Sequence, residues 1–249
     1  MRLILAATLA ASVLFPLAAC AQDPPGVEVR PGSPLLDASR IAARTDTFAI
    51  RVEGADPIQL VIRTAALGDT ALLRVERMSF GAREISVDSF AVRRPGLAPL
   101  FVESRGLNGI SRLAFSPGRA KGTYTPPERE ERTIDETLSK PLFYGNSIDL
   151  VLASLPLEAG RSYDLATWTP AGLDGVISVR VARAESVQAG DGARCEAWRV
   201  ETVDENGTKS VYWIEQSTGS LLGYSSSGME IRIVHHAACR PGPDPARTT

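Results

Sequence analysis

Histidines and carboxylates are the side chains that most often carry catalysis or bind metal ions, and this 249-residue sequence arranges them in no recognisable site. Its two histidines, His235 and His236, are neighbours. Adjacent residues of a strand point to opposite faces, so these imidazoles cannot readily share one metal ion. The sequence has no His-Glu-x-x-His, Gly-x-Ser-x-Gly or Cys-x-x-Cys pattern and no phosphate-binding glycine loop. We therefore expect no metal site and no cofactor.

Acidic pairs that could act as general acid and base are present, but their spacing is not diagnostic. Asp135 lies next to Glu136, and Asp149 precedes Glu158. Spacing along the chain cannot establish the separation of several ångströms that glycoside hydrolysis requires. The mixed-charge run 128–132 follows two prolines and is typical of a solvated loop. We expect a protein that is not an enzyme, with an uncharacterised hydrolase as an alternative.

Cys195 and Cys239 are the cysteines of the sequence other than Cys20. An oxidising compartment would let them form a disulfide, and closing a loop of about 45 residues would stabilise the fold by roughly 4 kcal/mol. Strand steps of about 4.8 Å would place them roughly 14 Å apart, against the ~4.4–6.8 Å that a disulfide requires. The bridge therefore requires that the sheet curls or that the C-terminal tail folds back.

The N-terminus has the organisation of a bacterial export signal. Met1 and Arg2 form a short cationic start, 3–14 an apolar core, and 16–20 a small-residue exit. The apolar core is shorter than the roughly 20 residues of a membrane-spanning helix. It is therefore predicted to be a signal peptide, which is left out of any reasoning about the fold.

The exit segment Leu17-Ala18-Ala19-Cys20 resembles the lipobox of bacterial lipoproteins. The resemblance implies a diacylglycerol on Cys20 and a membrane as partner, and two or more acyl chains hold stably at about 0.8 kcal/mol per methylene. In such lipoproteins an aspartate after the lipidated cysteine would retain the protein in the inner membrane. Because this position is Ala21, the resemblance implies that the protein is located on the periplasmic face of the outer membrane. Cleavage before Gln22 is the alternative, and would give a protein secreted to the periplasm.

The sequence predicts four parts: a signal peptide (1–19), a disordered tether (20–44), one antiparallel β domain (45–239) and a disordered tail (240–249). The tether is predicted because 22–34 is rich in Pro and Gly and has no apolar periodicity. The formal net charge is −2, with no basic run. Nucleic acid is therefore excluded as a partner, since phosphate neutralisation dominates such binding.

Alternating apolar and polar residues with Gly and Pro turns predict short antiparallel strands along nearly the whole mature chain. The predicted strands are 47–52, 58–62, 71–78, 85–92, 100–104, 111–115, 120–125, 163–169, 176–184, 195–203, 210–215, 220–224 and 230–235. One helix is predicted over 148–155, capped by Asn146 or Ser147 and ended by Pro156. The fold class is all-β.

A resemblance to periplasmic lipoprotein carriers of the Lol type lies in the C-terminal half. The motifs are Tyr212-Trp213-Ile214-Glu215, Thr218-Gly219 and Leu221-Leu222-Gly223-Tyr224. The placement of 152–160 before the last strands, with the strand start Gly160-Arg161-Ser162-Tyr163, resembles a poorly characterised family of exported β proteins with the same architecture. The resemblance covers 90–234 and implies a curved sheet or open half-barrel with one short helix. The strands in 45–80 are not accounted for, so they either extend this sheet or form a separate layer.

In such half-barrels the concave face is apolar, which implies an apolar ligand site. The candidate lining residues are Phe115, Phe143, Tyr144, Leu150, Trp168, Trp198 and Trp213. Large aromatics on strands are also ordinary core residues. We expect a non-enzymatic binding or carrier domain for a lipid, lipoprotein or other apolar envelope component. A structural lipoprotein that docks another envelope protein is the alternative.

Overall fold

The computed structural model describes residues 26–107, 109–170, 173–235 and 239. The elements are β1 (Val27–Val29), η1 (Ala38–Arg40), β2 (Arg44–Val52), β3 (Ile58–Leu67), β4 (Ala71–Phe80), β5 (Arg83–Arg93), β6 (Pro99–Gly106), β7 (Gly109–Ser116), β8 (Arg119–Thr125), β9 (Arg132–Thr137), β10 (Phe143–Tyr144), η2 (Gly145–Ser147), α1 (Ile148–Ser154), β11 (Ser162–Thr169), β12 (Leu173–Gln188), β13 (Arg194–Val203), β14 (Lys209–Glu215), β15 (Leu221–Ser226) and β16 (Met229–His235).

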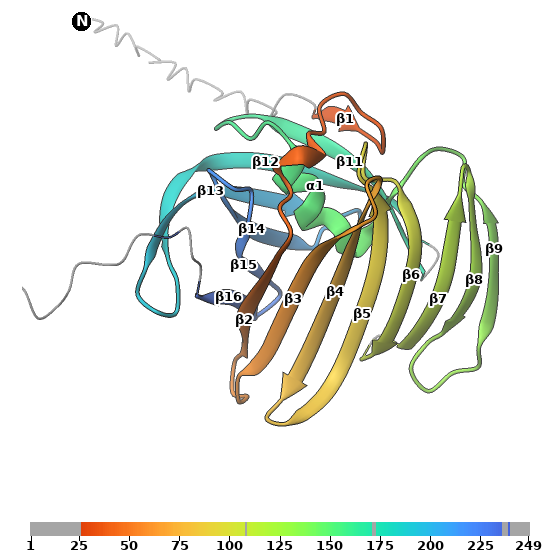
Figure 1. The fold of residues 1–249 in the computed structure, drawn as a ribbon, viewed down its shortest axis with the longest axis horizontal. Helices are drawn as coiled ribbons and strands as arrows, with labels where there is room; N and C mark the ends of the chain where they lie inside the picture. The colour runs from red at the N-terminus through yellow and green to blue at the C-terminus, as the bar shows by residue number, and fades with distance from the viewer. Residues whose placement is uncertain (1–25, 108, 171–172, 236–238, 240–249) are drawn as a thin grey trace, which may run out of the picture.

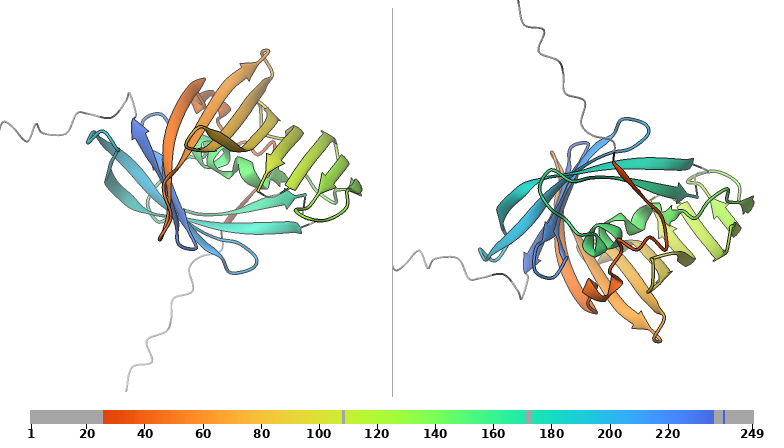
Figure 2. Two further views of the ribbon diagram at one scale, coloured as in Figure 1. Left: turned by 90° about the horizontal axis from the view of Figure 1, so that it is seen from below. Right: turned by 90° about the horizontal axis from the view of Figure 1, so that it is seen from above.

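Within the described residues, all strands belong to one 16-stranded sheet. Two antiparallel runs, β2 to β9 and β11 to β16, are joined where β16 pairs with β2. β1 and β10 both run parallel to β11. The sheet curves so that the two runs face each other (Figure 1 and Figure 2). The prediction of an all-β fold with an open curved sheet is confirmed, and the strands before Phe80 extend the same sheet.

The strands form because their residues alternate between a buried concave face and an exposed convex face. On β2, Phe48 and Ile50 are buried, and on β3 Leu60 and Ile62 are buried. These positions are cross-strand partners, since Phe48 pairs with Leu60. The concave face of β2 to β9 is therefore the predicted apolar face of each strand.

Helix α1 lies inside the curve, between the two runs of strands (Figure 2). All seven of its residues are buried, which confirms the one predicted helix. Ser147 is the N-cap residue, but its hydroxyl donates to the carbonyl of Tyr144, 2.7 Å away. The helix ends at Leu155, whose backbone is extended because Pro156 follows it. Among the described residues, no helix has the length and hydropathy of a membrane span.

The first described residues pack on the sheet, where the sequence suggested a disordered tether over 20–44. β1 pairs with β11, and Val29 and Ile41 are fully buried. The amide of Asp37 donates to the carbonyl of Ser154 at the end of α1, 2.9 Å away. Residues 26–44 therefore follow an extended path over one end of the half-barrel, and their few apolar residues hold them against the sheet and the helix.

The structure joins Cys195 and Cys239 in a disulfide, with Cα atoms 4.7 Å apart. The turn between β12 and β13 reaches the end of β16, because the amide of Gly190 donates to the carbonyl of Ile233 and that of Asp191 to Val234. The sheet thus curls enough to bring together strands that a flat sheet would hold far apart.

Side chains join the open edge of the sheet at β9 to the end of β11. The indole nitrogen of Trp168 donates to the carboxylate of Glu136, 3.0 Å away. The guanidinium of Arg132 donates to the carbonyl of Pro170. The half-barrel is therefore closed here by polar side chains, although β9 makes no backbone pairing with β11 in the described residues.

Candidate functional site

A row of polar side chains crosses the concave face from β4 to β8. Its members are successive cross-strand partners: Glu76, Asp88, Ser104, Ser111 and Tyr124. We call this row the polar belt. The neighbouring row, two residues along each strand, contains the core residues Phe90, Val102 and Leu113. The belt therefore lies on the concave face and borders the core under α1.

A buried ion cluster joins the belt to the helix. The Arg74 side chain is 2% exposed, and its Nε donates to Glu76, 3.1 Å away, while Nη1 donates to Thr64, 3.2 Å away. Its Nη2 donates to Asp149 on α1. Burying a guanidinium is costly unless its donors are satisfied, and here two carboxylates and a hydroxyl satisfy them.

Burial and the charges of this cluster shift the pKa values of its members. Burial raises the pKa of Glu76 to about 7, against the opposing charge of Arg74. Burial alone would lower the pKa of Arg74, but the charges of Asp149 and Glu76 raise it. A carboxyl group with a pKa near neutrality at the edge of a concave surface is a candidate functional group.

Asp88 is the next carboxylate of the belt and is 9% exposed. The Ser104 hydroxyl donates to it, and no Lys or Arg of the described chain forms an ion pair with it. Burial raises the pKa of Asp88, while the Ser104 hydrogen bond opposes that shift. Asp88 is therefore a buried acid that lacks a compensating cation.

Tyr144 on β10 is a buried tyrosine next to the belt. It is 4% exposed, and its ring packs edge-on against Phe90 with ring centroids 5.4 Å apart. Burial, followed by the charges of Asp88 and Glu76, raises the pKa of Tyr144. Phe90 follows Asp88 by two residues on β5, so the Tyr144 ring lies beside the belt.

The concave face also carries large apolar and aromatic side chains that remain half-buried. They are Ile58, Met78, Tyr212, Tyr224, Met229 and Ile231, which we call the rim. Cross-strand pairing links Tyr212 to Tyr224, Tyr224 to Ile231, and Ile231 to the buried Ile50. Side chains that point inward but stay partly exposed border solvent, so a ligand can reach the part of the concave face that the rim occupies.

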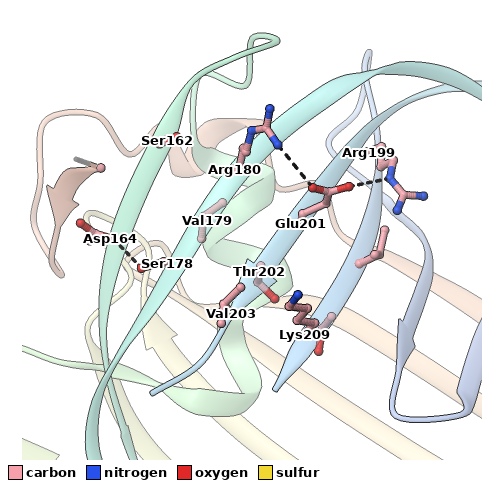
Figure 3. A pocket seen from close by; sticks show the side chains of 13 residues that line it. Ser162, Asp164, Ser178, Val179, Arg180, Arg199, Glu201, Thr202, Val203 and Lys209 are labelled. Carbon is pink, nitrogen blue, oxygen red and sulfur yellow. Dashed lines mark hydrogen bonds and ion pairs between the residues drawn. The ribbon is translucent and has the colours of Figure 1, made fainter. Parts of the chain in front are cut away.

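A second hollow lies on the opposite face of β11 to β14 (Figure 3). It has a volume of about 630 Å³, and most of its charged side chains have polar partners within it. Glu201 lies 3.9 Å from Arg180 and 3.1 Å from Arg199, and Ser178 donates to Asp164, 2.9 Å away. Exposed pairs of this kind contribute at most about 1 kcal/mol each. Three cations (Arg180, Arg199 and Lys209) and two acids (Asp164 and Glu201) line this hollow, which is a solvated groove with one excess positive charge.

The seven predicted lining residues do not surround one cavity. Phe143, Tyr144, Leu150 and Trp168 are at most 4% exposed and belong to the core. Trp198 is half-buried on β13 and packs against the same core.

The other two predicted lining residues border separate surface pockets. Phe115 packs edge-on against Trp168, with centroids 5.4 Å apart, and lines a pocket of about 290 Å³ with Pro31 and Pro99. Trp213 lines a different pocket of about 520 Å³, where the guanidinium of Arg232 lies 3.9 Å from its ring centre.

The acid pairs suggested by sequence are also apart. Asp135 binds Arg119 on the surface, while Glu136 accepts from Trp168. Asp149 lies in the buried cluster, whereas Glu158 forms an exposed pair with Arg161, 2.9 Å away. The described residues contain no group of three or more His, Cys, Asp or Glu side chains that could hold a metal ion. Cys20 and His236 lie outside the described residues, as does the side chain of His235.

Sequence reasoning missed Arg74, Glu76 and Asp88, although a signal for them exists. Arg74 and Glu76 stand in the apolar phase of their strand, between Leu72 and Met78. Charged residues at inward-facing positions of a strand indicate either that the inward and outward positions were assigned wrongly or that the strand carries a buried polar site. The structure shows a buried polar site.

Comparison with known proteins gives a family for this architecture. A family model described as "Protein of unknown function (DUF3108)" matches residues 40–224. The chain belongs to the DUF3108 family. The DUF3108 match runs from η1 into β15, so it contains the polar belt, α1 and part of the rim.

Among solved structures, a beta-barrel-like protein of the domain of unknown function DUF1849 from Brucella abortus is similar to this DUF3108 chain. The similarity covers 78% of this chain and 97% of that one, with 11% sequence identity and a TM-score of 0.43. No curated protein matches the chain.

Proposed function

We propose that this DUF3108 protein is a non-enzymatic binding or carrier domain for a lipid, lipoprotein or other apolar component of the bacterial envelope. A lipid on Cys20 would hold it on the periplasmic face of the outer membrane. The lipobox-like Leu17-Ala18-Ala19-Cys20 supports this anchor.

The rim is the observation that carries the proposal. Six large side chains point into the concavity but remain half-buried. Completing the burial of one large apolar side chain contributes up to about 1.5–3 kcal/mol, so an apolar ligand there would gain free energy from several such residues. The tightly packed core under α1 would hold the rim in place while a ligand enters and leaves.

A hydrolase is the second candidate, and the polar belt is what favours it. Glu76 and Asp88 are cross-strand partners, and burial raises the pKa of both. Two neighbouring carboxyl groups, one of them with a pKa raised toward neutrality, are the usual acid and base of glycoside hydrolysis. Glu76, however, already binds Arg74, which leaves one of its oxygens committed.

Native mass spectrometry tests the carrier function directly. The chain would carry Cys20→Ser and be exported behind a cleavable signal, and its mass would be compared before and after organic extraction. We expect a stoichiometric apolar molecule that extraction removes. A bare mass, even after incubation with envelope lipids, would contradict the proposal and favour a protein that docks another envelope protein. Turnover of glycoside or ester substrates that Glu76→Gln abolishes would favour the hydrolase.

A further inference from the structure

A pocket of about 290 Å³ lies at the end of the half-barrel opposite to the rim. Arg93 in its wall pairs with Ala71 at one end of β4, whereas the rim residue Met78 lies near the other end of that strand. The step from Ala71 to Met78 spans roughly 23 Å at about 3.3 Å per residue. The pocket is therefore separate from the rim.

The pocket is built where the β5–β6 turn, the β7–β8 turn and the segment after β9 meet the N-terminal segment (Figure 1). Backbone hydrogen bonds join these parts: the amide of Gly32 donates to the carbonyl of Gly96, 2.9 Å away, and that of Leu138 to the carbonyl of Gly118, 2.8 Å away. A Cβ atom on Gly96 would lie 2.5 Å from the Cα atom of Gly32, so this approach requires glycine. The main chain thus fixes the shape of the pocket.

Five of the thirteen residues that line the pocket are prolines, namely Pro31, Pro95, Pro99, Pro117 and Pro141. A proline ring fixes its own φ and has almost no rotamer freedom to lose when it is covered. A wall that is already ordered binds a ligand at little cost in conformational entropy. The pocket is therefore preorganised.

The β5–β6 turn holds a strained residue between two residues of the pocket wall. Leu97, fully buried, has a φ of +57°, and it lies between Pro95 and Ala98. The other non-glycine residues of the described chain with positive φ, Glu128 and Ser227, lie in exposed turns. A left-handed backbone is unfavourable for a bulky residue, and such strain is found preferentially at binding sites.

The charge of the pocket is positive. Arg93 is the one charged residue that the described chain contributes to the lining, and Ser116 supplies the other polar side chain. The Arg93 side chain is exposed and forms no ion pair with a carboxylate of the described residues. An apolar pocket with an unpaired guanidinium at its edge is complementary to an apolar chain that ends in a carboxylate.

We infer that this pocket binds a medium-chain carboxylate, with its hydrocarbon chain among the prolines, Phe115 and Leu138 and its carboxylate on Arg93. The volume corresponds to about ten water molecules at roughly 30 Å³ each. A methylene group occupies about as much space, so a chain of about eight to ten carbons fills the pocket. This inference adds a second site and does not depend on the rim.

Isothermal titration calorimetry near neutral pH tests the inference with hexanoate, octanoate, decanoate and dodecanoate, and with octanamide as a neutral probe. The chain carries Cys20→Ser so that no lipid competes. We expect affinity to rise by up to about fourfold for each added methylene, and to level off between ten and twelve carbons, when the pocket is full. Octanoate should bind about fivefold tighter than octanamide, the upper end for an exposed ion pair.

Arg93→Gln should abolish the preference for octanoate and leave octanamide binding unchanged. Arg94→Gln is the matched control, because it removes the same charge from the next residue, which does not line the pocket. Ala98→Phe places a ring in the pocket and should abolish binding of every probe, with the thermal midpoint as a check on folding. If the Ala98→Phe chain does not fold, the comparison of Arg93→Gln with Arg94→Gln still decides.

Affinity that keeps rising to dodecanoate, or a preference for octanoate that survives Arg93→Gln, overturns the inference. Octanoate binding that survives Ala98→Phe places the probe on another surface such as the rim, so it overturns this site and leaves the proposed binding function in place. Binding of none of the probes also overturns the site, while native mass spectrometry decides the proposed function separately.

Discussion

Arg74 on β4 and Asp149 on α1 are 75 residues apart in sequence and form an ion pair inside the half-barrel. Their side chains are 2% and 9% exposed, respectively. The pair ties the only α-helix of the described residues to the centre of the first run of strands. It therefore fixes α1 against the concave face, at the border of the polar belt.

We expect Asp149→Ala to destabilise the protein by about 3–5 kcal/mol, because it leaves Arg74 buried with only Glu76 to balance it. Urea denaturation measures this loss. Asp135→Ala is the control, since Asp135 forms an exposed pair with Arg119 whose removal should cost at most about 1 kcal/mol. Equal losses for the two variants would show that the interior pair does not hold α1.

Glu76→Gln should stabilise the protein at high pH. Glu76 has a pKa of about 7 when folded, against 4.5 as the ordinary value. The folded state therefore keeps a proton that the unfolded state releases, and stability falls as pH rises from 4.5 through 7. Glutamine does not titrate, so the variant should gain up to about 3 kcal/mol relative to the parent between pH 4.5 and pH 8.

Urea denaturation at both pH values measures the gain. Glu158→Gln, which removes an exposed carboxylate, should change stability by less than about 0.5 kcal/mol at either pH. A pH-independent effect of Glu76→Gln would contradict the burial of this acid.

The strands and the helix could be predicted because their signals are local. Alternation along Thr47–Val52 or Ile85–Val92 fixes which residues face inward, and Pro156 fixes the end of α1. The polar belt could not be predicted in the same way, since it exists only through the register of five strands. A pair such as Arg74 and Asp149 depends on where the sheet curves, which no local pattern specifies.

The candidate ligand residues show the same limit. An aromatic side chain is expected to be buried, but the sequence does not say against which surface it packs. Phe143 and Trp168 belong to the core, whereas Trp213 lies under the guanidinium of Arg232. The rim was not found because Ile58 and Met229 look like ordinary strand residues. Only their half-exposure on a concave face distinguishes them.

Replacing Cys195 and Cys239 with Ser should cost roughly 4 kcal/mol, the loop-closure value for the separation of 44 residues. The bridge holds the β12–β13 turn at the end of β16. Thermal unfolding under oxidising and reducing conditions measures the loss. Reduction should lower the midpoint of the parent and leave the double variant unchanged, and an unaffected parent would mean that backbone pairing alone maintains the curl.

Gly219 sits in the turn between β14 and β15, and its backbone has a φ of +68°. A Cβ atom there would lie 2.9 Å from the carbonyl oxygen of Ala153 in α1. Gly219→Ala therefore combines a left-handed backbone with a clash against the helix, and we expect a loss of about 2–3 kcal/mol.

Gly207→Ala is the matched variant, because Gly207 has a φ of +77° but open space around it. It should lose only about 1 kcal/mol, the cost of the left-handed backbone. Urea denaturation of both variants separates the two contributions. If the rim depends on the position of α1, Gly219→Ala should also weaken the binding of an apolar probe such as decanol, measured by isothermal titration calorimetry. Gly207→Ala should leave that affinity unchanged. Equal stability and equal binding for the two variants would show that the β14–β15 turn does not position the helix.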